Sequence, residues 1–143
     1  MTIPGTASPP AGAQPDVVAI RQESDIVHVR QRVRARASEL RFSLVDQTKL
    51  VTAASELARN ALVHGGGGRA RLEVLSANGR SGLRVIFEDD GPGMADVNEA
   101  LRDGFSTGGG LWLGLGGARR LVNEFEIASE VGHGTRIAIT RWV

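Results

Sequence analysis

The chain of 143 residues contains no cysteine and a single lysine, Lys49. Without cysteine it cannot form a disulfide, a thiolate zinc site or a cysteine nucleophile. Lys49 is followed by leucine, so the chain has no Gly-Lys-Ser/Thr sequence and cannot contain a Walker A phosphate loop. If the protein binds phosphate, another device binds it.

Long apolar runs and an excess of positive charge are missing as well. No segment approaches the run of about 18 apolar residues that marks a membrane-spanning helix. Residues 1–15 lack the basic start and the apolar stretch of a secretory signal. The formal net charge is only +1, which argues against strong whole-surface attraction to nucleic acid. We therefore expect a cytoplasmic protein with neither a membrane nor a nucleic acid as a partner.

The chain is rich in glycine, which makes up 19 of its 143 residues, about twice the usual share. Seventeen of these glycines lie between Gly65 and Gly134. They have no Gly-X-Y period, which excludes collagen, and a hydrophobic content of 41% argues against a disordered chain. The length fits one domain. We expect a disordered leader over residues 1–15, rich in Pro, Gly, Ala and Ser, and a single domain over residues 16–143.

Apolar periodicity predicts two long helices in the first half of the chain. Apolar residues recur at three- and four-residue steps over residues 26–44, with Ser24 or Asp25 as the expected N-cap. A second helix is expected to begin near Asp46, as its N-cap, and to end at the glycine run after His64.

Strand signals dominate the rest of the chain. A short strand over 17–20 precedes the first helix, and the turn Asn78-Gly79 joins strands over 70–75 and 83–87. The later elements expected are a helical turn near 96–101, a third helix over 115–122, and a closing hairpin of strands over 125–128 and 135–143. Early helices and late strands predict an α+β fold, a two-layer sandwich with helices on one face of a mixed, mainly antiparallel sheet.

One face of the second helix carries Glu56, Asn60 and His64 at four-residue spacing. Asn is unfavourable in the middle of a helix because its amide competes for backbone hydrogen bonds. A carboxylate one turn from an amide oxygen suits a general base beside a magnesium ligand, since magnesium takes oxygen donors. Taken alone, the same pattern is also typical of a solvated helix face.

Two turns at the ends of expected strands carry further candidates. Asp89 begins the sequence Asp-Asp-Gly-Pro-Gly. An Asp at a strand end can accept a hydrogen bond from an exocyclic amine, and Gly91 and Gly93 let a planar ring approach the backbone. A plain acidic turn explains the same residues. Between the last two strands, a hairpin turn explains Gly132-His-Gly-Thr135 by itself. Thr135 becomes a candidate ligand contact only when this motif is considered together with the others.

A glycine-rich segment from Gly104 to Gly117 runs into the expected third helix. Unhindered backbone amides before a helix start can bind an anion, and the helix dipole adds to them. This device could replace the absent lysine. A flexible linker is the alternative, but linkers do not interleave apolar residues such as Leu111, Trp112 and Leu113.

Together and in this order, the four motifs resemble the GHKL ATP-binding superfamily, which includes gyrase, Hsp90, histidine kinases and MutL. The resemblance spans about residues 16–143. Segments 55–60, 88–93, 103–107 and 120–125 look most like the small serine/threonine kinases of bacterial partner-switching systems, of the RsbT stressosome type. The resemblance implies the Bergerat ATPase fold, ATP and Mg²⁺ as cofactors, and protein serine/threonine kinase activity.

The resemblance also implies a role for each matched residue. Glu56 would activate the acceptor hydroxyl, Asn60 would coordinate Mg²⁺, and Asp89 would read the adenine amine. The other nucleotide contacts would lie beside the adenine ring or in the glycine lid and helix entry, where backbone amides would hold the phosphates: Gly91, Gly93, Thr107, Gly108, Gly109, Gly110, Gly114, Leu115 and Thr135.

Partners are likewise implied by the resemblance. A STAS-domain antagonist protein would be the phosphorylation substrate, and a PP2C-type phosphatase or a sigma factor would be the downstream partner. One position departs from the family, because its Gly-x-Gly-Leu at the helix entry is matched here by Trp112-Leu-Gly114-Leu115. This departure keeps a second hypothesis open, a binding module that uses ATP structurally or not at all.

Overall fold

The computed structural model describes residues 16–101 and 114–143. The predicted leader, 1–15, and most of the glycine-rich segment, 102–113, lie outside these ranges. The described elements, in chain order, are β1 (Asp16–Ile20), α1 (Glu23–Glu39), α2 (Leu44–Val63), β2 (Gly68–Ala77), β3 (Arg80–Asp89), α3 (Val97–Ala100), α4 (Leu115–Arg120), β4 (Glu124–Glu130) and β5 (Gly134–Trp142).

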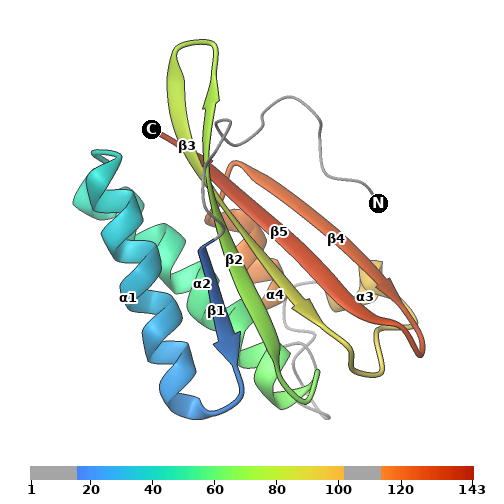
Figure 1. Cartoon of the computed structure of the whole chain (residues 1–143). Helices are drawn as coiled ribbons and strands as arrows, with labels where there is room; N and C mark the ends of the chain where they lie inside the picture. The colour runs from blue at the N-terminus through green and yellow to red at the C-terminus, as the bar shows by residue number, and fades with distance from the viewer. Residues whose placement is uncertain (1–15, 102–113) are drawn as a thin grey trace.

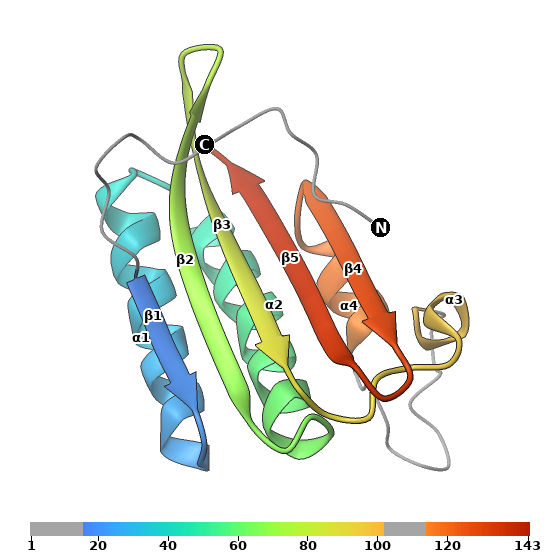
Figure 2. The same cartoon turned by 45° about the vertical axis from the view of Figure 1, so that its right-hand side comes forward.

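The five strands form one sheet in the order β1-β2-β3-β5-β4. Helices α1, α2 and α4 cover one face of this sheet (Figure 1, Figure 2). The arrangement confirms the predicted α+β sandwich with helices on one face. Among the described strands every pairing is antiparallel, so the sheet contains none of the parallel pairs that a mixed sheet allows. The last strand, β5, lies inside the sheet between β3 and β4.

The hydrophobic core lies between the sheet and the two long helices. The buried apolar residues of α1 and α2 recur at helical spacing, and they are Ile26, Val29, Val33, Ala37, Leu50, Val51, Ala53, Ala54, Leu57, Ala58 and Ala61. The predicted continuation of the first pattern to residue 44 is wrong, because α1 ends at Glu39 and Leu44 is 75% exposed at the start of α2. On β3, alternate residues Leu83, Val85 and Phe87 belong to the same core. Because side chains alternate along a strand, Asp89 lies on this helix-facing side, whereas Glu88 lies on the other.

Both long helices begin earlier than the sequence predicts. The cap of α2 is Ser43, whose Oγ accepts a hydrogen bond from the Asp46 amide at 3.1 Å. The cap of α1 is Gln22, and Asp25 accepts hydrogen bonds from the backbone amides of residues 21 and 22 at 2.8 and 3.1 Å. The predicted caps at Asp46 and at Ser24 or Asp25 are therefore wrong. Asp25 and Asp46 lie instead within the first turn of their helices, where the helix dipole favours a negative charge.

Local turn and cap signals predict the remaining elements well. Asn78 and Gly79 have φ values of 54° and 77°, as a type I′ turn requires. The expected helical turn is α3, whose N-cap Asp96 accepts a hydrogen bond from the Glu99 amide at 3.0 Å. In the described ranges, no helix combines the length and apolar character needed to cross a membrane.

Candidate functional site

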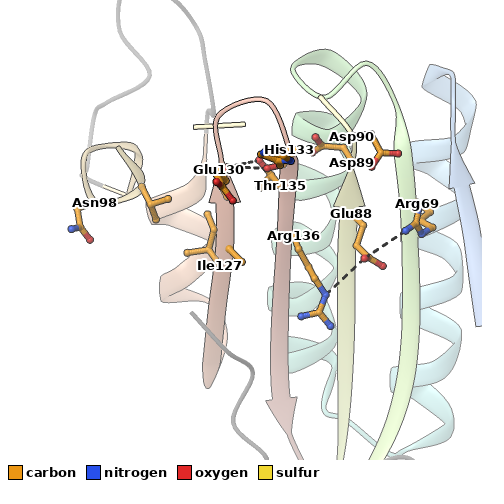
Figure 3. Close-up of a pocket in the computed structure, with 14 residues that line it drawn as sticks. Arg69, Glu88, Asp89, Asp90, Asn98, Ile127, Glu130, His133, Thr135 and Arg136 are labelled. Carbon is orange, nitrogen blue, oxygen red and sulfur yellow. Dashed lines mark hydrogen bonds and ion pairs between the residues drawn. The ribbon is translucent and has the colours of Figure 1, made fainter. Parts of the chain in front are cut away.

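Asp89 and Thr135 lie opposite one another at the ends of β3 and β5. Their exposed fractions are only 7% and 4%. Asp89 Oδ1 accepts a hydrogen bond from the Gly91 amide at 3.0 Å. Figure 3 shows the two side chains next to one another at the strand ends. The structure therefore brings together the two residues that the sequence places in separate motifs, and it buries both polar side chains at the strand ends.

The environment of Asp89 opposes its ionisation. Burial raises the pKa of the Asp89 carboxyl above its ordinary value, and the charge of Asp90 adds to this effect. Hydrogen bonds from the backbone amides of Gly91 and Thr135 act in the opposite direction, because they favour the carboxylate. The net result is a raised pKa, so the protein keeps a carboxyl here at a cost in stability.

Acidification is expected to stabilise the wild type relative to Asp89→Asn. Because the pKa of Asp89 is raised on folding, the folded protein binds this proton more readily than the unfolded chain. The wild type should gain stability relative to the variant as the pH falls through the folded pKa, until both states are protonated below about pH 3.9. Urea unfolding of both proteins from neutral to acidic pH measures the difference. A constant difference, or one that moves against the wild type on acidification, contradicts the assignment.

Glycines bring the end of α2 against Asp89. A Cβ on Gly65 would lie 2.4 Å from Asp89 Cγ, and a Cβ on Gly91 would lie 2.6 Å from Gly65 Cα. No side chain fits at either position without moving the carboxyl or the backbone. The sequence predicts Gly65 only as the end of the second helix, whereas the structure places it against the Asp89 carboxyl.

Gly93 has a different neighbour from the one expected. Its φ is +73°, and a Cβ there would lie 2.2 Å from the carbonyl oxygen of Glu130. The structure thus places Gly93 against the end of β4, where a side chain would push the two segments apart. Its expected position beside an adenine ring stays a prediction.

Asn60 and Glu56 lie on α2, one turn apart. Asn60 is 2% exposed, and its backbone carbonyl oxygen accepts hydrogen bonds from the amides of His64 and Gly65 at 2.9 and 3.2 Å. The interpretation of this face as solvated is therefore wrong for Asn60. Glu56 is partly buried, and a Cβ on Gly114 would lie 2.6 Å from its Oε2. A side chain at position 114 would thus collide with the Glu56 carboxylate, and glycine avoids this contact.

The lid contacts are described only in part. Gly114 caps α4 with a φ of +77°, and Leu115 is 1% exposed, packed in the core. The other predicted lid residues lie outside the described ranges, as does the departure at Trp112; they are Thr107, Gly108, Gly109 and Gly110.

A pocket of about 640 Å³ opens at this end of the sheet, within the size range typical of small-molecule sites. Its lining combines both faces of the sheet edge: Asp89, Thr135 and Ser129 lie on the helix-facing side, Val97 and Asn98 belong to α3, and Arg69, Glu88 and Arg136 are charged residues of the other face (Figure 3). Glu56 and Asn60 of α2 are not among its described lining residues. We call it the base pocket, because Asp89 and Thr135, the two predicted adenine contacts, line it.

The donor set fits a nucleotide and a magnesium ion. Asp89 and Thr135 offer oxygen acceptors to an amine, while Glu56 and Asn60 offer a carboxylate and an amide oxygen, the ligand types that Mg²⁺ prefers. Within the described residues there is no group of three or more His, Asp or Glu side chains that could hold a metal. Such a site suits Mg²⁺ that arrives with phosphates and waters as its other ligands.

Comparison with known proteins identifies the family. Residues 45–142 match the model of the histidine kinase-, DNA gyrase B- and HSP90-like ATPases. The chain belongs to this family. The match includes α2, the strands that carry Asp89 and Thr135, and the helix entry at Gly114.

Individual relatives refine this result. The chain is 46% identical over 126 residues to the serine/threonine-protein kinase RsbT of Bacillus subtilis (strain 168), covering 88% of this chain and 95% of the relative. It is 27% identical over 117 residues to the anti-sigma F factor of Clostridium novyi (strain NT), covering 78% of this chain and 82% of the relative. The first similarity confirms the prediction of a serine/threonine-protein kinase.

A solved structure shares the fold. The crystal structure of the RsbU and RsbW domains of Rv1364c from Mycobacterium tuberculosis matches with a TM-score of 0.61 and 24% sequence identity. The match covers 90% of this chain but only 32% of that chain. It confirms the predicted family fold.

Proposed function

We propose that the protein uses ATP and Mg²⁺ in the cytoplasm to phosphorylate a serine or threonine of a STAS-domain antagonist, and that the freed kinase then binds a PP2C-type phosphatase or a sigma factor. The observation that carries this proposal is the buried pair Asp89 and Thr135, in register across β3 and β5 and open to one pocket. The 46% identical kinase supports the reaction class, and the anti-sigma F factor supports the partner-switching role.

In this proposal the base is held at the strand ends. The Asp89 carboxylate accepts a hydrogen bond from the exocyclic amine of adenine, and Thr135 supports that contact. The Gly91 amide donates a hydrogen bond to Asp89 Oδ1, so the carboxylate is held in place before the nucleotide arrives. The phosphates would extend toward the amides of Gly114 and the lid.

Glu56 acts at the reacting end. It accepts the proton of the acceptor hydroxyl while that oxygen forms a bond to the γ-phosphorus and the bond to the departing ADP oxygen breaks. Asn60 supplies an amide oxygen as a ligand for Mg²⁺. Bound Mg²⁺ would offset the negative charge of the phosphates. The new phosphoryl group adds about −1.5 to −2 charges to the partner interface, which separates kinase and antagonist.

Incubation of the protein with Mg-ATP and the STAS-domain protein encoded nearest to it tests the proposal. We expect a phosphoserine or phosphothreonine on the antagonist, with loss of the complex as it accumulates. Omission of Mg²⁺ is the control and should abolish the product. A complex that forms normally while no phosphoprotein appears contradicts the kinase proposal. That result would favour the binding module, the second candidate, which rests on Trp112 in place of a lid glycine.

A further inference from the structure

A serine outside all four sequence motifs connects the parts of the base pocket. Ser129 lies on β4, on the helix-facing side, and lines the same pocket as Asp89 and Thr135. Its Oγ accepts a hydrogen bond from the Met94 amide at 2.8 Å. It also lies 2.8 Å from Thr135 Oγ1 and 3.2 Å from the carbonyl oxygen of Gly134. Ser129 thus joins the loop after β3 to the start of β5.

The hydrogen-bonding capacity of a hydroxyl orders these three contacts. A serine oxygen has two lone pairs and one proton. The Met94 amide can only donate, so it occupies one lone pair, and the Gly134 carbonyl can only accept, so it takes the proton of Ser129. Thr135 must then donate its own proton to the second lone pair of Ser129. This is the one assignment that satisfies all three contacts at once.

The assignment decides what Thr135 offers to a ligand. With its proton committed to Ser129, the Thr135 oxygen presents only lone pairs. Asp89, on the neighbouring strand, presents a carboxylate that is also an acceptor when ionised. Two fixed acceptors favour a ligand group that donates, and they repel a carbonyl oxygen at the same place.

We propose that Ser129 is a positioning residue for base selectivity, because it holds Thr135 as an acceptor beside Asp89. The pair then selects adenine, whose 6-position carries an amine, over hypoxanthine or guanine, whose 6-position carries an oxo group. This inference rests on the proposed ATP-dependent function. Without the Ser129 hydroxyl, the proton of Thr135 Oγ1 is no longer committed and can be donated to an oxo group.

Isothermal titration of the full chain with Mg-ADP and Mg-IDP tests the proposal. The wild type is expected to prefer ADP. Ser129→Ala is expected to bind ADP about three- to tenfold more weakly, and to lose most of its preference over IDP. Ser129→Thr, which keeps the hydroxyl, should retain the preference for ADP over IDP. Ser76→Ala, an exposed serine-to-alanine change on β2, is the matched control and should leave the preference unchanged.

The outcomes separate this inference from the function on which it rests. If Ser129→Ala binds ADP and IDP with equal losses, Ser129 is merely structural and the proposal is overturned. If Ser129→Ala does not fold, Thr135→Val replaces it and should lose the same preference; an intact preference there also overturns the proposal. If the wild type binds neither nucleotide, the ATP-dependent function fails and the inference fails with it. Asp89→Asn, which should weaken ADP binding whatever Ser129 does, reports on the function alone.

Discussion

Glu56→Gln is expected to lower the rate of phosphotransfer to the protein substrate by about 10²- to 10⁴-fold, the range typical for loss of a general base. The substitution keeps the size of the side chain but removes the group that accepts the hydroxyl proton. Glu56 is partly buried against Gly114 and lies apart from the base pocket. Affinity for Mg-ATP should therefore stay within a few-fold of the wild type. Single-turnover phosphorylation together with nucleotide titration measures both quantities.

The control for Glu56→Gln is the same substitution at Glu23. That carboxylate lies at the start of α1, is 71% exposed and pairs with Arg59 at the surface. A surface pair of this kind contributes little, so Glu23→Gln should phosphorylate at the wild-type rate. A Glu56→Gln protein that retains its rate within a few-fold would show that another group takes the proton. Loss of ATP affinity in that variant would instead assign Glu56 to binding.

Gly134→Ala is expected to lower the free energy of unfolding by about 2–5 kcal/mol. Gly134 has a φ of +83°, and a Cβ there would lie 2.0 Å from the carbonyl oxygen of Asp89. The added methyl group therefore brings left-handed backbone strain and also pushes β5 away from the end of β3. Urea unfolding measures the loss, and nucleotide titration should show weaker binding because Asp89 and Thr135 separate.

Gly132→Ala separates the two causes of this stability loss, backbone strain and the collision with Asp89. Gly132 lies in the same turn with a φ of +85°, yet a Cβ there would meet nothing within 4 Å. It should lose only the conformational part, roughly 1–2 kcal/mol, and should keep its nucleotide affinity. Equal losses in the two variants would mean that the close approach to Asp89 costs nothing, and the proposed coupling between turn and pocket would be wrong.

Local signals predicted most of the elements, because their causes lie within a few residues. The Asn78-Gly79 turn needs only its own φ values, and the buried apolar residues of α2 need only helical spacing. Local signals do not specify the start of α2, since Ser43 and Asp46 are both residue types that favour the N-cap position. Asp46 is instead engaged by Arg141 at 2.6 Å, a contact between distant parts of the chain that no local pattern contains.

In the candidate site, too, local motifs predict some residues, while others depend on contacts between distant parts of the chain. Glu56, Asn60, Asp89 and Thr135 stand in recognisable motifs, and the structure places the last two together. Gly65 contacts a carboxyl that lies far from it along the chain, so its role depends on how α2 meets β3. Ser129 is an ordinary strand serine in the sequence. Its hydrogen bonds depend on the order of β3, β5 and β4, which sequence periodicity does not specify.

The position of β5 inside the sheet has a consequence for synthesis on the ribosome. Asp89 emerges well before Thr135, and until β5 inserts between β3 and β4 the carboxyl has no partner strand on that side. Pairing between distant segments is the slow part of forming such a sheet. The nascent chain therefore cannot capture a nucleotide with its first three strands, and competence to bind should arise abruptly, with the insertion of β5.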